Sequence, residues 1–154
     1  MDIKVSSEVL RLGLSVGYFS VQDAVKWADN LIGNLESPPY EIIEVSLSAN
    51  KKPVDICSIL LKLNGNFDEE ISIKVMLGLL QNYLIETKDY ENVWSWVYRL
   101  NEYIPLSYDW ILNEIIYLSN AIYLAEQDIY GDVLEVKKEL LVFLGQFEKY
   151  SNYI

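Results

Sequence analysis

Pairs of carboxylates are the side chains in this sequence whose spacing could support catalysis. Glu41 and Glu44 are three residues apart, and Asp68, Glu69 and Glu70 are consecutive. Paired carboxylates can serve as general acid and base or can bind a metal ion. The second group, however, opens a predicted helix, where acidic side chains interact favourably with the helix dipole. We interpret both groups as structural and keep a carboxylate-and-metal enzyme as a third function hypothesis.

The rest of the chemical inventory argues against an enzyme. The chain has no histidine, one cysteine and seven scattered glycines. It therefore has no Ser-His or Cys-His relay and no Glu-x-x-His di-iron pattern, and its glycines form no phosphate-binding motif. Cys57 lies in an apolar run, where we expect a small buried hydrophobe, and a lone cysteine excludes an intrachain disulfide. We predict no enzyme activity, no cofactor and no metal.

Length and charge narrow the class of protein further. The 154 residues favour a single domain spanning residues 1–154, and the 51% of hydrophobic residues excludes a disordered tail. With 23 acidic and 12 basic side chains, the net charge is −11, which argues against a nucleic-acid partner. No apolar run is long enough to cross a membrane, and the first residues carry acids and lack the long apolar run expected of a signal peptide. We expect a cytoplasmic protein that binds neither nucleic acid nor membrane.

The acidic side chains are unevenly distributed, and one stretch combines them with aromatic residues. Between Leu100 and Val136 there is no Lys or Arg, but there are seven acids and six Tyr or Trp residues. A surface of one charge sign accelerates association with a partner of opposite charge, and Tyr and Trp are enriched at binding hot spots. The predicted partner-binding residues are Glu102, Tyr103, Asp109, Trp110, Glu114, Tyr117, Asp128 and Tyr130. They indicate a basic protein as the partner.

A structural interpretation of the same stretch stays open. On a helical wheel for residues 107–129, the core positions are Ile111, Ile115, Leu118, Ile122, Ala125 and Ile129. Trp110, Glu114 and Tyr117 lie about a quarter-turn away, where aromatic rings could pack against a neighbouring helix. The acids could equally form a solvated surface that keeps the protein soluble. The sequence alone leaves interface and core as alternatives for the aromatic residues.

The hydrophobic spacing predicts an all-α fold. Apolar residues recur at helical intervals between short breakers, and strand signals are weak. Ser20 with Asp23 forms a capping-box pattern, Pro53 and Asp68 suit helix starts, and Gly131 suits a C-terminal cap. We predict seven or eight helices arranged as antiparallel helical hairpins, over residues 7–16, 21–35, 40–49, 54–63, 68–87, 89–104, 107–129 and 132–150.

In size, acidity and tyrosine content the chain resembles the immunity proteins paired with bacterial polymorphic and contact-dependent toxins. The segments Val25–Asp29 and Pro39–Ser48 also look like a pattern that recurs in small bacterial proteins. The resemblance implies a single-domain, non-enzymatic bacterial protein that neutralises a basic toxin, and it assigns no site residues. The alternative is a helical scaffold or regulatory adaptor that binds a peptide or protein in a groove between helical hairpins.

Overall fold

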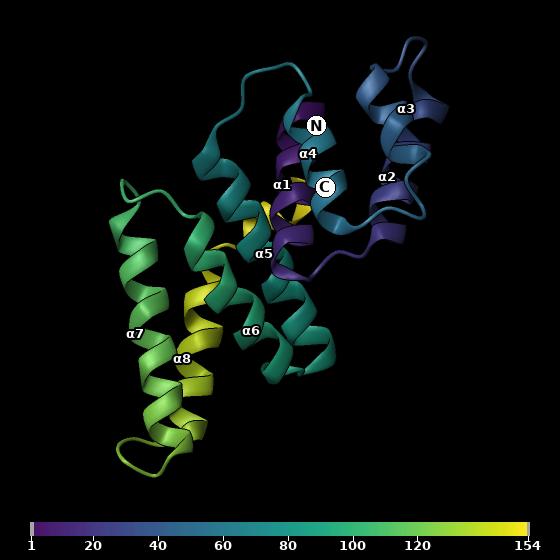
Figure 1. Ribbon diagram of the computed structural model, residues 1–154. Coiled ribbons are helices and arrows are strands. Elements are labelled where there is room, and N and C mark those ends of the chain that lie inside the picture. Colours follow the sequence, from purple (N-terminus) through teal and green to yellow (C-terminus); the bar gives the residue numbers. More distant parts are fainter. Residues whose placement is uncertain (1, 154) are drawn as a thin grey trace. The chain divides into compact units, whose positions relative to one another are not determined.

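The computed structural model describes residues 2–153, and within these residues every regular element is a helix. The prediction of an all-α fold with seven or eight helices is confirmed by eight α-helices and two short 3-10 helices (Figure 1). Their bounds are α1 Ile3–Val16, α2 Val21–Asn34, α3 Tyr40–Ser46, α4 Pro53–Leu61, α5 Glu69–Thr87, α6 Tyr90–Leu100, η1 Asn101–Tyr103, α7 Asp109–Glu126, α8 Val133–Gly145 and η2 Glu148–Tyr153.

The chain divides into two compact units, one ending at Ser72 and the other beginning at Ile73. In the first unit, α1 packs against α4, α2 against α3, and α3 against α4 (Figure 1). The capping box predicted at Ser20 and Asp23 opens α2. The core of this unit contains Leu10, Leu14, Ala24, Ala28, Ile42, Val45, Ile56, Ile59, Leu60 and Leu63. The prediction of one domain over the whole chain stays a prediction.

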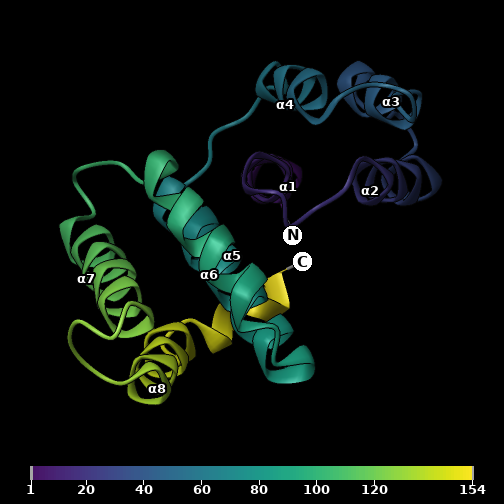
Figure 2. The ribbon, with the colours of Figure 1, turned by 60° about the horizontal axis from the view of Figure 1, so that its bottom comes forward.

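In the second unit, α7 packs against both α6 and α8. Figure 2 shows α7 and α8 side by side, joined by a short loop. The core positions predicted for α7 are confirmed in five of six cases, since Ile111, Ile115, Leu118, Ile122 and Ala125 are buried. The sixth prediction, Ile129, is wrong: this side chain is exposed because α7 ends at Glu126.

The end of α7 also corrects the predicted cap. Gln127, not Gly131, is the C-cap residue, and Asp128 follows with a φ of 55°. The amides of Ile129 and Tyr130 both donate to the carbonyl of Leu124, which closes the helix end. An Asp in this left-handed conformation is less costly than most residues, so a cap formed before the glycine. Gly131 has a φ of 84° and lies later in the loop to α8.

Helix α5 buries side chains on more than one side. Five almost completely buried side chains share one stripe, Ile73, Met76, Leu77, Leu80 and Leu84, and Val75 is buried on the opposite side of the helix. Gly78 permits one close approach, because a Cβ there would lie 2.5 Å from the carbonyl oxygen of Phe147. No helix in the described part of the chain is long and apolar enough to span a membrane.

Candidate protein-interaction face

All eight predicted partner-binding residues lie in the second unit, and most are open to solvent. Trp110, Tyr117 and Tyr130 are 49%, 53% and 79% exposed, which favours the interface interpretation over the core for these three rings. Glu102, Tyr103, Asp109 and Asp128 are also exposed, whereas Glu114 is half-buried. We call these eight residues the acidic–aromatic face.

The acidic–aromatic face follows α7 from end to end and is not a compact cluster. Glu102 and Tyr103 lie in η1, before the helix begins. Asp128 and Tyr130 lie in the loop that follows it. The 18 residues of α7 between them extend about 27 Å. A partner that contacted the whole face would need an extended surface.

Trp110 is held in place by a contact with the core. Its indole stacks on the ring of Phe147, with centroids 5.7 Å apart and planes inclined by 18°. Phe147 in turn packs edge-on against Phe143 on α8. Because Phe147 is buried, one side of the indole is fixed while the rest stays accessible. A rigid, half-exposed aromatic ring loses little conformational entropy when a partner binds it.

The centre of the face contains a residue that the sequence reasoning missed. The carboxylate of Glu139 on α8 raises the pKa of the Tyr117 phenol, first through its negative charge, and partial burial and a hydrogen bond to Glu139 add to the effect. The charges of Glu114 and of the Tyr130 phenol act in the same direction. Glu114, Tyr117, Tyr130 and Glu139 are therefore neighbours. Glu139 follows Lys137 and Lys138, so a search for a stretch without basic residues stopped before it.

Two cavities of the second unit share Trp94 of α6 in their linings. One, of about 420 Å³, is lined by Tyr90, Glu91, Trp94, Ile122, Glu126, Val133 and Lys137. Another, of about 430 Å³, is lined by Trp94, Ser95, Tyr98, Ser119, Asn120, Ile122 and Tyr123. Both are in the size range of small-ligand pockets. The sequence analysis did not predict them, because Trp94 and Glu91 lie outside the stretch without basic residues.

Two polar atoms beside these cavities lack hydrogen-bond partners. The indole nitrogen of Trp94 and the hydroxyl oxygen of Ser119 are both buried and unpaired in the described structure. An unpaired buried donor or acceptor costs about 1–3 kcal/mol, so such atoms are uncommon in folded proteins. Both atoms lie where α6 and α7 pack together, and Gln81 Oε1 of α5 is a third such atom in the second unit.

Two of the candidate catalytic carboxylates, Glu44 and Asp68, have structural partners. Glu44 lies 4.0 Å from the ammonium of Lys51. Asp68 accepts a hydrogen bond of 2.9 Å from the amide of Glu70 at the start of α5. Both observations agree with the structural interpretation of these carboxylates.

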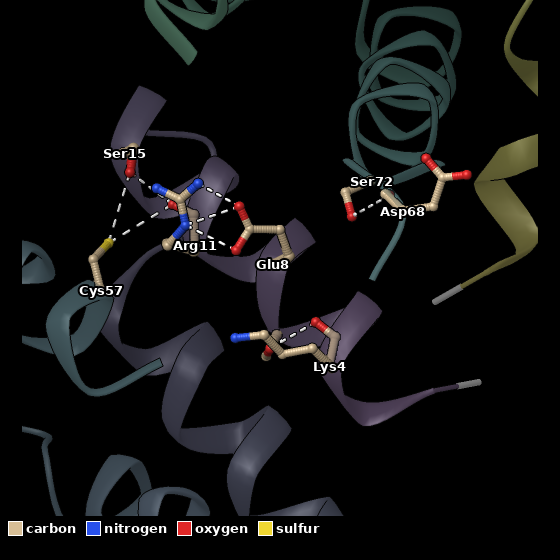
Figure 3. A network of polar contacts seen from close by, with 8 residues as sticks. Lys4, Glu8, Arg11, Ser15, Cys57, Asp68 and Ser72 are labelled. Carbon is tan, nitrogen blue, oxygen red and sulfur yellow. Dashed lines mark hydrogen bonds and ion pairs between the residues drawn. The ribbon is translucent and has the colours of Figure 1, made fainter. Parts of the chain in front are cut away.

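Cys57 belongs to a polar network in the first unit (Figure 3). Its thiol lies 3.7 Å from the Ser15 hydroxyl and 3.7 Å from the Arg11 carbonyl, and Arg11 pairs with Glu8. Burial raises the pKa of the thiol, which keeps it protonated at neutral pH. Cys57 was predicted to be a small buried hydrophobe; its side chain packs against the apolar core of the first unit but is only partly buried.

The structure and the comparisons add no cofactor chemistry and no family. Within residues 2–153, no group of three or more His, Cys, Asp or Glu side chains could hold a metal ion. Comparisons of the chain with protein-family models, curated proteins and solved structures found no match.

Proposed function

We propose that this chain is a non-enzymatic binding protein that engages a basic protein partner through the acidic–aromatic face. The observation that supports this most is the combination of exposed aromatic rings with unpaired acids along α7. Trp110, Tyr117 and Tyr130 offer rigid apolar area, and Glu102, Asp109, Glu114 and Asp128 form no ion pair within the described residues. Such acids can pair with a partner's cations without first breaking internal ion pairs.

The physical roles of the two residue types differ. Acids at the rim of an interface mainly raise the association rate, and this effect weakens as salt screens the charges. Buried aromatic anchors mainly slow dissociation, because removing them leaves a pocket on the partner unfilled. The proposal therefore expects charge variants to change the association rate and the Trp110 variant to change the dissociation rate.

In its specific form, the proposal is that the protein is a cytoplasmic immunity protein that neutralises a basic toxin domain of a bacterial competitor system. The small size, the acidity and the tyrosine content support this form. A toxin-like gene directly beside the coding sequence would strengthen it, and co-expression with that toxin domain should then restore growth. Unrelated neighbouring genes, or growth arrest despite co-expression, would contradict the immunity role.

A charge-matched pair of variants tests the binding face. The first variant carries Glu102→Gln, Asp109→Asn, Glu114→Gln and Asp128→Asn. The control carries Glu36→Gln, Glu41→Gln, Glu69→Gln and Glu86→Gln, which removes the same charge elsewhere. We expect the first variant to lose affinity capture of the basic partner from the native host while the control retains it. Equal retention by both variants would contradict the assigned face.

A helical adaptor that binds a peptide in a groove is the second candidate. The cavities beside Trp94 favour it, since they lie between neighbouring helices and aromatic rings form part of both linings. An apolar groove would bind with an affinity almost independent of salt, whereas the acidic–aromatic face would not. Measuring the dissociation constant of the captured partner at low and high salt separates the two candidates.

A further inference from the structure

One cavity of the second unit has the lining expected for a cationic side chain. It measures about 420 Å³ and lies where α6, α7 and α8 meet. Tyr90, Glu91 and Trp94 line it from α6, Ile122 and Glu126 from α7, and Val133 and Lys137 from α8. Aromatic rings and carboxylates therefore surround the same space.

The carboxylates of this cavity are unpaired. Glu91 and Glu126 are exposed, and neither forms a hydrogen bond or ion pair with any described residue. Lys137 is the basic side chain of the lining, but it does not form an ion pair with either of them. Two negative charges against one positive charge leave the cavity with a net negative charge.

The position of Lys137 shows that the aromatic lining can hold a cation. Its ammonium lies 5.1 Å from the centroid of the Tyr90 ring, within the range of a cation–π contact. The Tyr90 ring thus already contacts a cation of the same chain. A cation from a partner could contact this ring, the Trp94 ring and the carboxylates of Glu91 and Glu126.

We propose that this cavity binds an arginine side chain of a protein partner, with the guanidinium against Glu91 and Glu126 and its flat face on the Tyr90 or Trp94 ring. A guanidinium fits better than an ammonium because it is planar, presents five donors and stacks on aromatic rings. The lining of this cavity shares no residue with the acidic–aromatic face. The proposal rests on the proposed function only in naming a basic protein as the source of the arginine.

The test uses N-acetylarginine amide as the probe and N-acetylcitrulline amide as its uncharged counterpart. The indole N–H signal of Trp94 is the readout, and it is assigned among the signals of the four tryptophans with a Trp94→Phe variant. We expect the arginine probe to shift this signal at millimolar concentration and the citrulline probe to leave it unchanged. Equal shifts from both probes, or none from either, would overturn the proposal.

Three variants refine the test. Glu91→Gln with Glu126→Gln should weaken binding of the probe about two- to fivefold, the usual effect of losing exposed charge pairs. Glu69→Gln with Glu86→Gln, the matched control outside the cavity and the acidic–aromatic face, should leave it unchanged. Lys137→Gln should strengthen binding about two- to fivefold because it frees the Tyr90 ring and removes a like charge. Weaker binding after Lys137→Gln would show that the cavity prefers an anion, and the proposal would be wrong.

Failure of the arginine site and failure of the proposed function give different results. If the variant with Glu102→Gln, Asp109→Asn, Glu114→Gln and Asp128→Asn loses partner binding and the probe does not bind at Trp94, the proposed function stands and only the arginine site is refuted. If the probe binds at Trp94 and the same four-fold variant still captures the partner, the assigned face is refuted and the arginine site stands.

Discussion

The indole of Trp110 stacks on the ring of Phe147 at a centroid distance of 5.7 Å. This contact joins the start of α7 to the short connection between α8 and η2, and it leaves 49% of the tryptophan surface exposed. Trp110 therefore has two roles: it covers a buried phenylalanine, and it presents an ordered aromatic surface to solvent. Separating these roles requires measurements of both stability and binding.

Trp110→Ala should lower the free energy of unfolding by roughly 1–2 kcal/mol, because it removes an aromatic pair and uncovers Phe147. Urea denaturation measures this change. Tyr123→Ala, at another exposed ring of α7 with no ring contact in the structure, should change the free energy of unfolding by less than about 0.5 kcal/mol. Equal effects of the two substitutions would contradict the role assigned to the stack.

Two glycines in helices should respond in opposite directions to substitution by alanine. Gly78→Ala places a Cβ 2.5 Å from the carbonyl oxygen of Phe147, and we expect a loss of about 1–3 kcal/mol because backbone must move. Gly33→Ala meets no atom within 4 Å and should stabilise α2 by about 0.5–1 kcal/mol. Urea denaturation of the two variants checks both signs, and a stable Gly78→Ala protein would contradict the close approach of α5 to Phe147.

The sequence predicts helices well wherever capping and hydrophobic spacing agree. Ser20 and Asp23 form the predicted capping box, and α4 begins at Pro53 as expected. The helix predicted over residues 7–16 begins four residues earlier, at Ile3, and contains ten buried residues. The first turns of α1 lack the apolar spacing of an amphipathic helix because four polar residues are buried there: Lys4, Ser6, Ser7 and Glu8. The hydroxyls of the two serines donate to backbone carbonyls one turn earlier.

The candidate site was predictable in part, for a physical reason. Helical spacing within α7 predicted the stripe of Trp110, Glu114 and Tyr117, because residues three and four apart share a helix face. The effect of Glu139 on Tyr117 and the cavity beside Trp94 could not be predicted in this way. Both depend on how α6 and α8 pack against α7. Such contacts between helices depend on packing angles and loop lengths that the spacing within one helix does not encode.

A hydrogen bond between Tyr83 and Asp89 should make stability depend on pH at both extremes. The Tyr83 hydroxyl donates to the Asp89 carboxylate over 2.9 Å, and Asp89 also accepts from Asn92 at the start of α6. Hydrogen bonds from Asn92 and then Tyr83 lower the pKa of Asp89 below its ordinary value of 3.8. The hydrogen bond to Asp89, with some desolvation, raises the pKa of Tyr83 above 10.0.

The direction of each pH dependence follows from the linkage between protonation and folding. The contribution of Asp89 is complete above pH 3.8 and is lost as the pH falls through its lowered folded-state pKa. The contribution of Tyr83 is complete below pH 10.0 and is lost as the pH rises through its raised folded-state pKa. Urea midpoints of the protein and of Tyr83→Phe should therefore converge above pH 10. A difference that stays constant through this range would contradict the hydrogen bond.

Removing the charge of Glu139 should change the titration of Tyr117. The negative charge of Glu139 is the largest cause of the raised pKa of Tyr117, so Glu139→Gln should lower this pKa toward its ordinary value of 10.0. Nuclear magnetic resonance of the Tyr117 ring carbons follows the titration directly. Glu135→Gln, which removes a charge paired with Lys138, is the control and should leave the Tyr117 pKa unchanged.

Site-specific photo-crosslinking in the native host tests the central claim most directly. A photoreactive phenylalanine analogue replaces Tyr117 on α7 in one version of the protein and Tyr40 on α3, an even more exposed tyrosine, in the other. The account predicts an adduct with one basic protein from position 117, weakened by added salt, and no such adduct from position 40. An adduct from position 40 alone, or a salt-independent adduct with an acidic protein from position 117, would contradict it.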